Sequence, residues 1–240
     1  MTAAAPRDIP EELICGSGQT PQDVEGGVVL LVDKPRGCTS HDVVDRVRRH
    51  AGIRKVGHAG TLDPLATGLL IVLVARPATR LQQAFMKLPK TYEGTLRLGE
   101  TTPSHDAETD VTETHDISPL TAADLEAART QFEGTIRQVP PMYSAVKIDG
   151  ERLYKKARRG ESVERPPRQV RIDAFELTGW SGSDVSFRVQ CSKGTYIRSL
   201  ARDVGQALEV GAHLVALRRT AIGPYSVEQA WSLEALLDVL

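Results

Sequence analysis

The stretch Gly57-His58-Ala59-Gly60-Thr61-Leu62-Asp63-Pro64-Leu65-Ala66-Thr67-Gly68 combines backbone freedom with an apolar setting for a single acid. Its glycines and its proline make a helix or a regular central strand improbable through its first half. Asp63 carries the only formal charge, and Pro64 pushes the residue before it toward extended dihedral angles. We therefore expect a loop that displays the Asp63 carboxylate in a fixed direction.

Two explanations fit an aspartate in such a loop. In the simpler one, Asp63 caps the backbone of an ordinary solvated turn. A solvated turn has no need of the apolar neighbours Leu62, Leu65 and Ala66, whereas a nucleophile or a base in a dry pocket does. The composition of the loop therefore favours a catalytic carboxylate.

The whole chain has the composition of a soluble globular protein. It has 240 residues, 40% of them hydrophobic and 25% charged, which allows one large domain or two small ones. The longest apolar run, Leu69–Ala75, is too short to cross a bilayer. Residues 1–25 contain no apolar stretch like that of a signal peptide, so we expect a flexible leader followed by one catalytic domain over residues 26–240.

The cysteines indicate a reducing compartment. Their number is odd, they form no Cys-x-x-Cys pair, and no histidines cluster with them; they are Cys15, Cys38 and Cys191. We therefore expect free thiols in a cytoplasmic protein and no structural zinc site.

The net charge of −1 hides two blocks of opposite charge. Between Leu98 and Ala128 there are eight acids and no Lys or Arg, whereas residues 136–171 hold ten basic residues against four acids. Such blocks are usually solvated faces. They also allow a nearly neutral protein to present one positive face to phosphates.

Hydrophobic patterns predict an α+β fold. A buried strand is expected over Gly27–Asp33, and Ser40 is a good N-cap for a helix that buries Val43, Val44 and Val47. Further strands are expected at residues 69–74, 92–98, 185–191 and 214–222, helices at 79–88, 121–132, 197–208 and 231–240, and a surface loop at 100–118. Because strands do not alternate regularly with long helices, we expect a mixed or mainly antiparallel sheet.

A second informative segment is Cys191-Ser192-Lys193-Gly194-Thr195-Tyr196-Ile197-Arg198-Ser199-Leu200. If Thr195 caps the following helix, Arg198 lies in its first turn, where the macrodipole disfavours a cation. Position 202 is another arginine, so Arg198 has no acid one turn ahead. A surface arginine lying over its own helix is one explanation, and a partner from elsewhere in the fold is the other.

The segment Lys55–Pro64 resembles the catalytic loop of the bacterial TruB-type tRNA pseudouridine 55 synthases, and Gly194–Arg198 resembles their Gly-Thr-Tyr-Ile-Arg motif. The resemblance implies that Asp63 is catalytic, that Arg198 pairs with it, and that Tyr196 packs beside the bound base. Such a pairing makes physical sense, because a nearby arginine lowers the pKa of a buried carboxyl and fixes its orientation.

Other segments extend the resemblance. Lys90-Thr91-Tyr92 matches a signature whose tyrosine stacks on the target base, and whether Tyr92 also removes the C5 proton is left open. The resemblance makes His58 a contact of the flipped nucleotide, Leu217 part of the uracil pocket, and Lys34, in the mainly architectural segment Gly27–His41, a possible phosphate contact.

The implied fold is that of pseudouridine synthases, with a central mixed sheet and an RNA-binding cleft. The implied reaction is an isomerisation of uridine 55 in the tRNA T-loop, through a flipped-out base and attack by Asp63 on ribose C1′ or uracil C6. It needs no cofactor and no metal. The expected partner is the T-loop and T-stem of tRNA, with no membrane and no protein partner, and a monomer suffices.

Two departures from the family pattern stand out. Thr109 occupies a position where many relatives have glycine. Relatives usually continue into a small C-terminal RNA-binding module of the PUA type, and we expect that module to be absent or truncated here.

Three alternatives also fit the sequence. One is a non-catalytic tRNA-binding protein or folding chaperone, and another is a synthase of the same family that acts on another RNA. The third is a metal-dependent hydrolase built on the only acid and histidine cluster: His105, Asp106, Glu108, Asp110 and His115.

Overall fold

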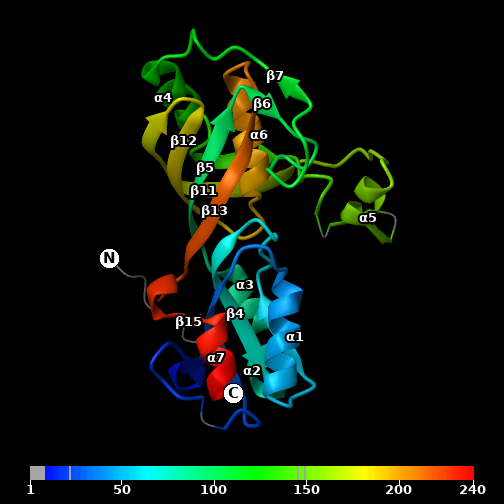
Figure 1. The fold of residues 1–240 in the computed structure, drawn as a ribbon, viewed down its shortest axis with the longest axis vertical. Helices are drawn as coiled ribbons and strands as arrows, with labels where there is room; N and C mark the ends of the chain where they lie inside the picture. Colours follow the sequence, from blue (N-terminus) through cyan, green and yellow to red (C-terminus); the bar gives the residue numbers. More distant parts are fainter. Residues whose placement is uncertain (1–8, 22, 145, 149) are drawn as a thin grey trace. The chain divides into compact units, whose positions relative to one another are not determined.

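The computed structural model describes residues 9–21, 23–144, 146–148 and 150–240, and its elements are shown in Figure 1. The described chain forms two compact units. The first unit contains the residues up to Tyr92 together with Leu217–Leu240, and the second contains Glu93–Ala216. The chain leaves the first unit within β5 (Lys90–Leu98) and returns to it within β13 (Ala212–Ile222).

The sheet of the first unit is mixed. Its centre is β4 (Thr67–Val74), which pairs antiparallel with β2 (Val28–Lys34) and with β3 (Val56–Ala59). The end of β13 runs parallel to β4, with Arg218 opposite Thr67 and Arg219 opposite Gly68. Three two-residue strands complete this sheet: β1 (Ile14–Cys15), β14 (Tyr225–Ser226) and β15 (Trp231–Ser232).

Helices cover both faces of this sheet because side chains alternate along β2 and β4. One face packs against α1 (Ser40–His50) and α7 (Leu233–Val239), in a cluster that includes Leu30, Val32, Val44, Val72 and Leu236. The other face packs around Phe85 of α3 (Gln82–Lys87), next to α2 (Ala75–Thr79), in a cluster that includes Leu31, Leu69 and Ile71.

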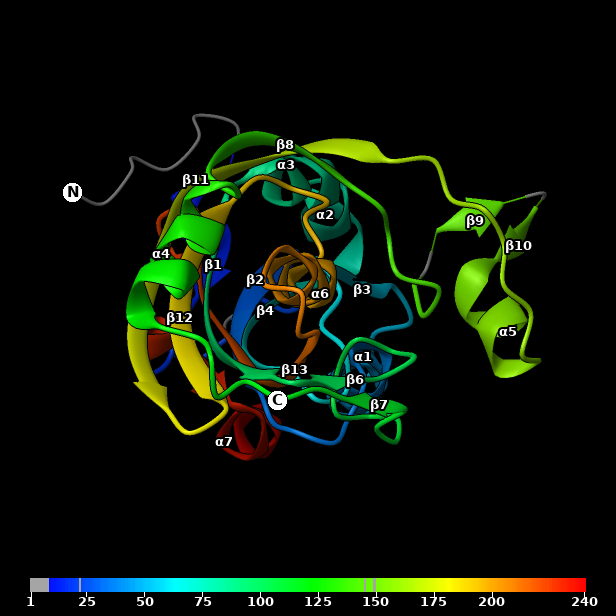
Figure 2. The same ribbon diagram turned by 90° about the horizontal axis from the view of Figure 1, so that it is seen from above.

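In the second unit, β5 is followed across the sheet by β12 (Asp184–Cys191), β11 (Arg168–Ser181) and β8 (Gly134–Gln138). Strands β12, β11 and β8 pair antiparallel, and the sheet curves around α6 (Ile197–Ala207), as Figure 2 shows. Helix α4 (Ala122–Thr130) contacts β11 and α6.

Two small hairpins belong to the same unit. One is formed by β6 (Glu100–Thr101) and β7 (Glu113–Thr114). The other is formed by β9 (Lys147–Ile148) and β10 (Glu151–Arg152), which lead into α5 (Leu153–Arg158). In both views this second hairpin and α5 project away from the sheet of their unit.

The predicted α+β class with a mixed sheet is confirmed, and most predicted elements lie within one or two residues of the observed ones. Part of the predicted leader is ordered, because Ile14 and Cys15 of β1 pair parallel with Val29 and Leu30 of β2. Residues 1–8 of that leader lie outside the described residues.

Four local predictions need correction. The N-cap of α1 is Thr39 rather than Ser40, because Thr39 and Asp42 form a reciprocal capping box. Thr195 does not cap α6, whose N-cap position is held by Tyr196 without a side-chain hydrogen bond. The single helix expected at residues 79–88 is divided into α2 and α3.

The fourth correction concerns where the expected loop of the Gly57–Gly68 stretch begins, because β3 continues to Ala59 as an edge strand that, among the described strands, pairs with β4 alone. Pairing with β4 uses backbone groups, which a glycine also supplies, so Gly57 does not interrupt this short strand. The irregular loop therefore begins at Gly60.

Candidate active site

The loop from Gly60 to Gly68, here called the Asp63 loop, is bounded by two glycines with positive φ, +94° and +98°. Residues other than glycine rarely adopt this region of backbone dihedral angles. A Cβ atom on Gly68 would also lie 2.3 Å from the carbonyl oxygen of Arg219. Both glycines are therefore required by the path of the backbone, and they fix where the loop leaves β3 and joins β4.

Contacts to the start of α1 hold the middle of the Asp63 loop. The hydroxyl of Ser40 hydrogen-bonds both the N–H and the carbonyl of Leu62, at 2.8 and 3.2 Å. The N–H of Gly37 donates to the carbonyl of Pro64 at 2.9 Å, and a turn from Asp63 to Ala66 closes through a 3.1 Å hydrogen bond.

The apolar neighbours of Asp63 are buried, as the sequence predicted. Leu62 is 4% exposed, Leu65 7% and Ala66 1%, whereas Asp63 itself is half-buried. The carboxylate is thus presented from a loop whose apolar side chains Leu62, Leu65 and Ala66 lie in the core. This arrangement fits a reactive group better than a solvated turn.

His58 lies on β3 opposite Val72 of β4, and its carbonyl accepts a hydrogen bond from Gln82 at 2.8 Å. Its Nδ1 is buried and has no hydrogen-bond partner among the described residues. Burial, together with the charge of Arg219, lowers the pKa of His58, so the imidazole is neutral at pH 7.

Three further predicted site residues belong to the first unit. Tyr92, on β5, and Leu217, on β13, are 8% and 9% exposed. Lys34 is fully buried, and its ammonium donates to the carbonyls of Pro35 and Cys38 at 2.9 and 2.7 Å. Lys34 therefore holds the turn before α1, and its burial does not fit the phosphate contact that the sequence suggested.

Arg198, the central residue of the second segment, lies in the first turn of α6 and is 4% exposed. Its guanidinium donates to the carbonyls of Ser104 and Tyr143 at 3.0 and 2.7 Å, and its Nε lies 3.4 Å from a carboxylate oxygen of Asp106. The expectation of a partner from elsewhere in the fold is therefore met by Asp106.

Asp106 belongs to the acidic stretch for which the sequence predicted a surface loop. That prediction is wrong for its centre, because Asp106 and Ser104 are 1% and 2% exposed. Ser104 Oγ donates to the Asp106 carboxylate, and a buried carboxylate facing a buried guanidinium satisfies both charges.

Tyr196 precedes α6 and exchanges two hydrogen bonds with the Gln138 side chain, at 2.8 and 3.1 Å. The predicted site residues thus fall into two groups. Asp63, His58, Tyr92, Leu217 and Lys34 belong to the first unit, and Arg198 and Tyr196 belong to the second. The pairing of Asp63 with Arg198 stays a prediction.

Sequence reasoning missed one residue that contacts the Asp63 loop. Arg219 is 1% exposed, and its guanidinium donates to the carbonyls of Leu69 and Gly60 at 2.7 and 2.9 Å. The available signal was an arginine inside the alternating apolar pattern of β13, which reads equally well as a basic surface residue.

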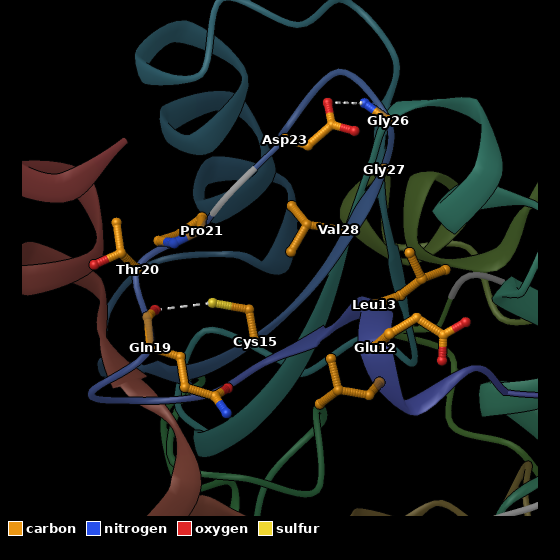
Figure 3. A pocket seen from close by; sticks show the side chains of 11 residues that line it. Glu12, Leu13, Cys15, Gln19, Thr20, Pro21, Asp23, Gly26, Gly27 and Val28 are labelled. Atoms are coloured by element: carbon orange, nitrogen blue, oxygen red, sulfur yellow. Dashed lines mark hydrogen bonds between the residues drawn. The ribbon is translucent and has the colours of Figure 1, made fainter.

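A cavity of about 560 Å³ lies elsewhere in the first unit, next to the N-terminal segment (Figure 3). Cys15 donates its thiol to the carbonyl of Gln19 at 3.1 Å inside it, and Asp23 accepts from the N–H of Gly26. The residues that line it include none of the predicted site residues.

Comparison with known proteins identifies the class. Residues 48–197 match the model of the TruB family pseudouridylate synthase N-terminal domain, and residues 198–240 match that of the tRNA pseudouridylate synthase B C-terminal domain. These matches place the chain among the pseudouridylate synthases, isomerases that convert uridine to pseudouridine. Within that class, the chain belongs to the TruB family.

Relatives and solved structures agree with this assignment. The chain is 51% identical over 208 residues to a tRNA pseudouridine synthase B of Opitutus terrae, and the match covers 87% of this chain and 86% of the relative. It is 52% identical over 216 residues to that of Thermobifida fusca, covering 87% and 73%.

Among solved structures, a chain of a Cbf5-Nop10-Gar1 complex matches with a TM-score of 0.71 and 33% identity. A chain of an H/ACA RNP bound to a substrate RNA matches with a TM-score of 0.68 and 29% identity. These matches cover 98% and 99% of this chain but only 60% and 61% of the solved chains, so this chain spans about three fifths of their length.

The described residues add two further observations. No helix in the described ranges has the length and apolar character needed to cross a membrane. Within the described part of the chain, which includes the cluster from His105 to His115, no three His, Cys, Asp or Glu side chains are grouped so as to hold a metal ion. Family membership assigns the chain to the isomerases rather than to the metal-dependent hydrolases.

Proposed function

We propose that this chain isomerises uridine 55 in the T-loop of tRNA to pseudouridine, with Asp63 as the nucleophile. The names of relatives about half identical to it, tRNA pseudouridine synthase B, support tRNA as the substrate. The observation that carries the proposal is the setting of Asp63. A half-buried carboxylate lies on a loop that is fixed at both glycine ends and hydrogen-bonded at Leu62 and Pro64.

The chemistry needs an ionised, oriented carboxylate. Arg198 is proposed to supply both properties by pairing with Asp63, because a fixed cation favours the charged form and holds its orientation. Asp106 in turn fixes Arg198 through their 3.4 Å ion pair. In this proposal the Arg198 guanidinium interacts with two carboxylates, the buried one of Asp106 and that of the nucleophile Asp63.

The proposed reaction has the following steps. Uridine 55 is flipped out of the T-loop, and its base is held by stacking on Tyr92 and by apolar contact with Leu217. Asp63 attacks ribose C1′ or uracil C6, and the N1–C1′ bond breaks. The uracil turns, the C5–C1′ bond forms, and the bond to Asp63 breaks, which frees the carboxylate. The hydrogen on C5 leaves as a proton, and N1 takes up a proton. No electron transfer is involved.

A basic hollow of about 380 Å³ in the first unit supports RNA binding. Lys55, Arg76 and Arg80 line it, all three are exposed, and its lining includes no acid. Lys55 directly precedes β3, which leads into the Asp63 loop. Phosphate contacts of this kind position an RNA without reading its sequence.

Tritium release tests the reaction and the residue together. tRNA carrying 5-tritiated uridine is incubated with the wild type and with Asp63→Asn, which keeps the volume of the side chain but removes its charge. The expected result is release near one equivalent per tRNA by the wild type and none by the variant. Release by Asp63→Asn at the wild-type rate would remove Asp63 from the mechanism.

A second assay tests the position. After reaction, pseudouridine is mapped by carbodiimide modification and primer extension on the wild-type tRNA and on a tRNA with cytidine at position 55. A stop at position 55 that disappears with the substituted tRNA is expected. Modification elsewhere in the tRNA, or only in another RNA, would contradict the proposed specificity. Tight tRNA binding without any release would instead indicate a binding protein or chaperone.

A further inference from the structure

The side chain of Arg219 is a buried cation without an acidic partner. It is 1% exposed, and no carboxylate lies within ion-pair distance of it among the described residues. Its neighbour Arg218 differs, since it pairs with Asp33 at 2.7 and 3.1 Å and is partly exposed. Burial of an uncompensated guanidinium is costly, and an apolar residue of similar volume is often at least as stabilising. The presence of an arginine here therefore calls for a role other than filling space.

The hydrogen bonds of Arg219 indicate that role. Its guanidinium donates to the carbonyl of Gly60 at 2.9 Å, at the start of the Asp63 loop, and to the carbonyl of Leu69 at 2.7 Å, just after its end. One rigid planar group thus joins the two ends of the loop. A lysine ammonium cannot reproduce the spacing of two separate guanidinium nitrogens.

The two glycines of the loop fit around the same residue. A Cβ on Gly60 would lie 3.3 Å from Nη1 of Arg219, and a Cβ on Gly68 would lie 2.3 Å from its carbonyl oxygen. Arg219 and Gly68 are also register partners in the parallel pairing of β13 with β4. Side chain and backbone of this one residue therefore contact both ends of the loop that carries Asp63.

We propose that Arg219 is a positioning residue, which fixes the Asp63 loop through the carbonyls of Gly60 and Leu69 and thereby sets the direction of the Asp63 carboxylate. This inference rests on the proposed role of Asp63. Arg219 acts on the rate of the chemical step without contacting the reacting atoms. A misplacement of about 1 Å in a nucleophile is enough to cost about a hundredfold in rate.

The test compares Arg219→Met and Arg219→Lys with the wild type in single-turnover tritium release, together with the Kd for tRNA. Methionine keeps an unbranched chain but loses both hydrogen bonds, and lysine keeps the charge. We expect the rate to fall about a hundredfold in Arg219→Met and by an intermediate factor in Arg219→Lys, while the Kd changes less than about twofold.

Controls separate positioning from stability. Leu236→Ala removes buried apolar contacts of α7 in the same unit, on the other face of the sheet from Phe85. Its urea midpoint should fall at least as far as that of Arg219→Met, while its rate stays within about twofold of the wild type. A folded Arg219→Met enzyme with a wild-type rate overturns the proposal. Equal rate losses in Leu236→Ala and Arg219→Met at equal midpoints also overturn it.

A variant on the loop side covers the case in which Arg219→Met does not fold. Gly60→Ala leaves Arg219 in place and presses a methyl group against its Nη1. It should lower the rate, and combining it with Arg219→Lys should lower the rate less than the product of the two single effects. Strictly multiplicative effects would contradict a shared contact. Asp63→Asn, measured beside them, distinguishes failure of this inference from failure of the proposed function, since only the latter allows an active Asp63→Asn.

Discussion

The hydroxyl of Ser40 and the backbone of Leu62 hydrogen-bond each other in both directions, although 22 residues separate them in the chain. Leu62 N–H donates to Ser40 Oγ at 2.8 Å, and Ser40 Oγ donates to the Leu62 carbonyl at 3.2 Å. Both residues are buried, and Leu62 directly precedes Asp63. The first residue of α1 thus supports the proposed nucleophile through the backbone.

Ser40→Ala should therefore lower both stability and rate. It leaves the N–H and the carbonyl of Leu62 buried without partners, which costs about 1–3 kcal/mol. Because the N-cap is Thr39, the substitution does not remove the cap of α1, and alanine is a good helix former. Urea denaturation and single-turnover tritium release measure the two effects. Thr130→Ala is the control, because the Thr130 hydroxyl bonds only within α4, to Ala127, and is exposed.

Arg198→Lys should lose at least tenfold in rate while tRNA still binds. The guanidinium reaches Ser104, Tyr143 and Asp106 at once, and a lysine ammonium cannot hold all three in the same geometry. A loss of one pKa unit of stabilisation already corresponds to about a tenfold change. Single-turnover rate and Kd are measured together. A rate within about twofold of the wild type would show that the guanidinium contacts of Arg198 are not needed for the reaction, and it would contradict the proposed pairing of Arg198 with Asp63.

The sequence predicted the elements of the first unit well because their apolar residues recur at the regular spacing of a helix or form an uninterrupted run. Val43, Val44 and Val47 repeat at helical spacing and are all buried in α1, and the continuous apolar run of β4 is buried on both faces. Boundaries were less predictable. Thr39 and Ser40 are both good N-caps, and only the geometry of the capping box with Asp42 distinguishes them.

The buried polar residues were the harder part of the site. Asp106 sits among seven other acids in a stretch without basic residues, so local composition indicates solvent exposure. Its burial depends on Arg198, which is 92 residues away in the chain. Arg219 is similar, because its acceptors are carbonyls of loop ends, and carbonyls leave no residue-specific signal in a sequence.

His105 should make the second unit less stable in mild acid. Burial, and to a lesser extent the nearby charges of Arg202, Arg198 and Arg165, together lower its pKa from 6.5 to about 4. The unfolded chain therefore binds a proton between about pH 6.5 and pH 4 that the folded chain does not. Stability is full above pH 6.5 and falls as the pH drops through this window, by an amount on the order of 3 kcal/mol.

His105→Asn tests this assignment. His105 has a φ of 60°, a backbone conformation that asparagine tolerates better than most residues. Urea midpoints of the wild type and the variant are compared at pH 7.5 and pH 5. The variant should lose less stability between the two values. The burial-lowered pKa of His58 acts in the same direction, so some pH dependence should remain. An equal fall of the urea midpoint from pH 7.5 to pH 5 in both proteins would show that His105 does not titrate in this way.

Substitutions in the basic hollow should weaken RNA binding uniformly and reduce its salt dependence. Arg76→Gln and Arg80→Gln each remove one exposed charge from a lining without acids. If each arginine neutralises one phosphate, the slope of log K against log salt should become shallower by about 0.7 to 0.9 for each variant. The rate at saturating tRNA should stay unchanged, because neither residue belongs to the Asp63 loop.

Arg97→Gln is the control, since the charge of Arg97 is already compensated by Asp184 at 2.7 and 3.0 Å. A control slope that falls as much as those of Arg76→Gln and Arg80→Gln would mean that the protein's overall charge, rather than this hollow, attracts the RNA.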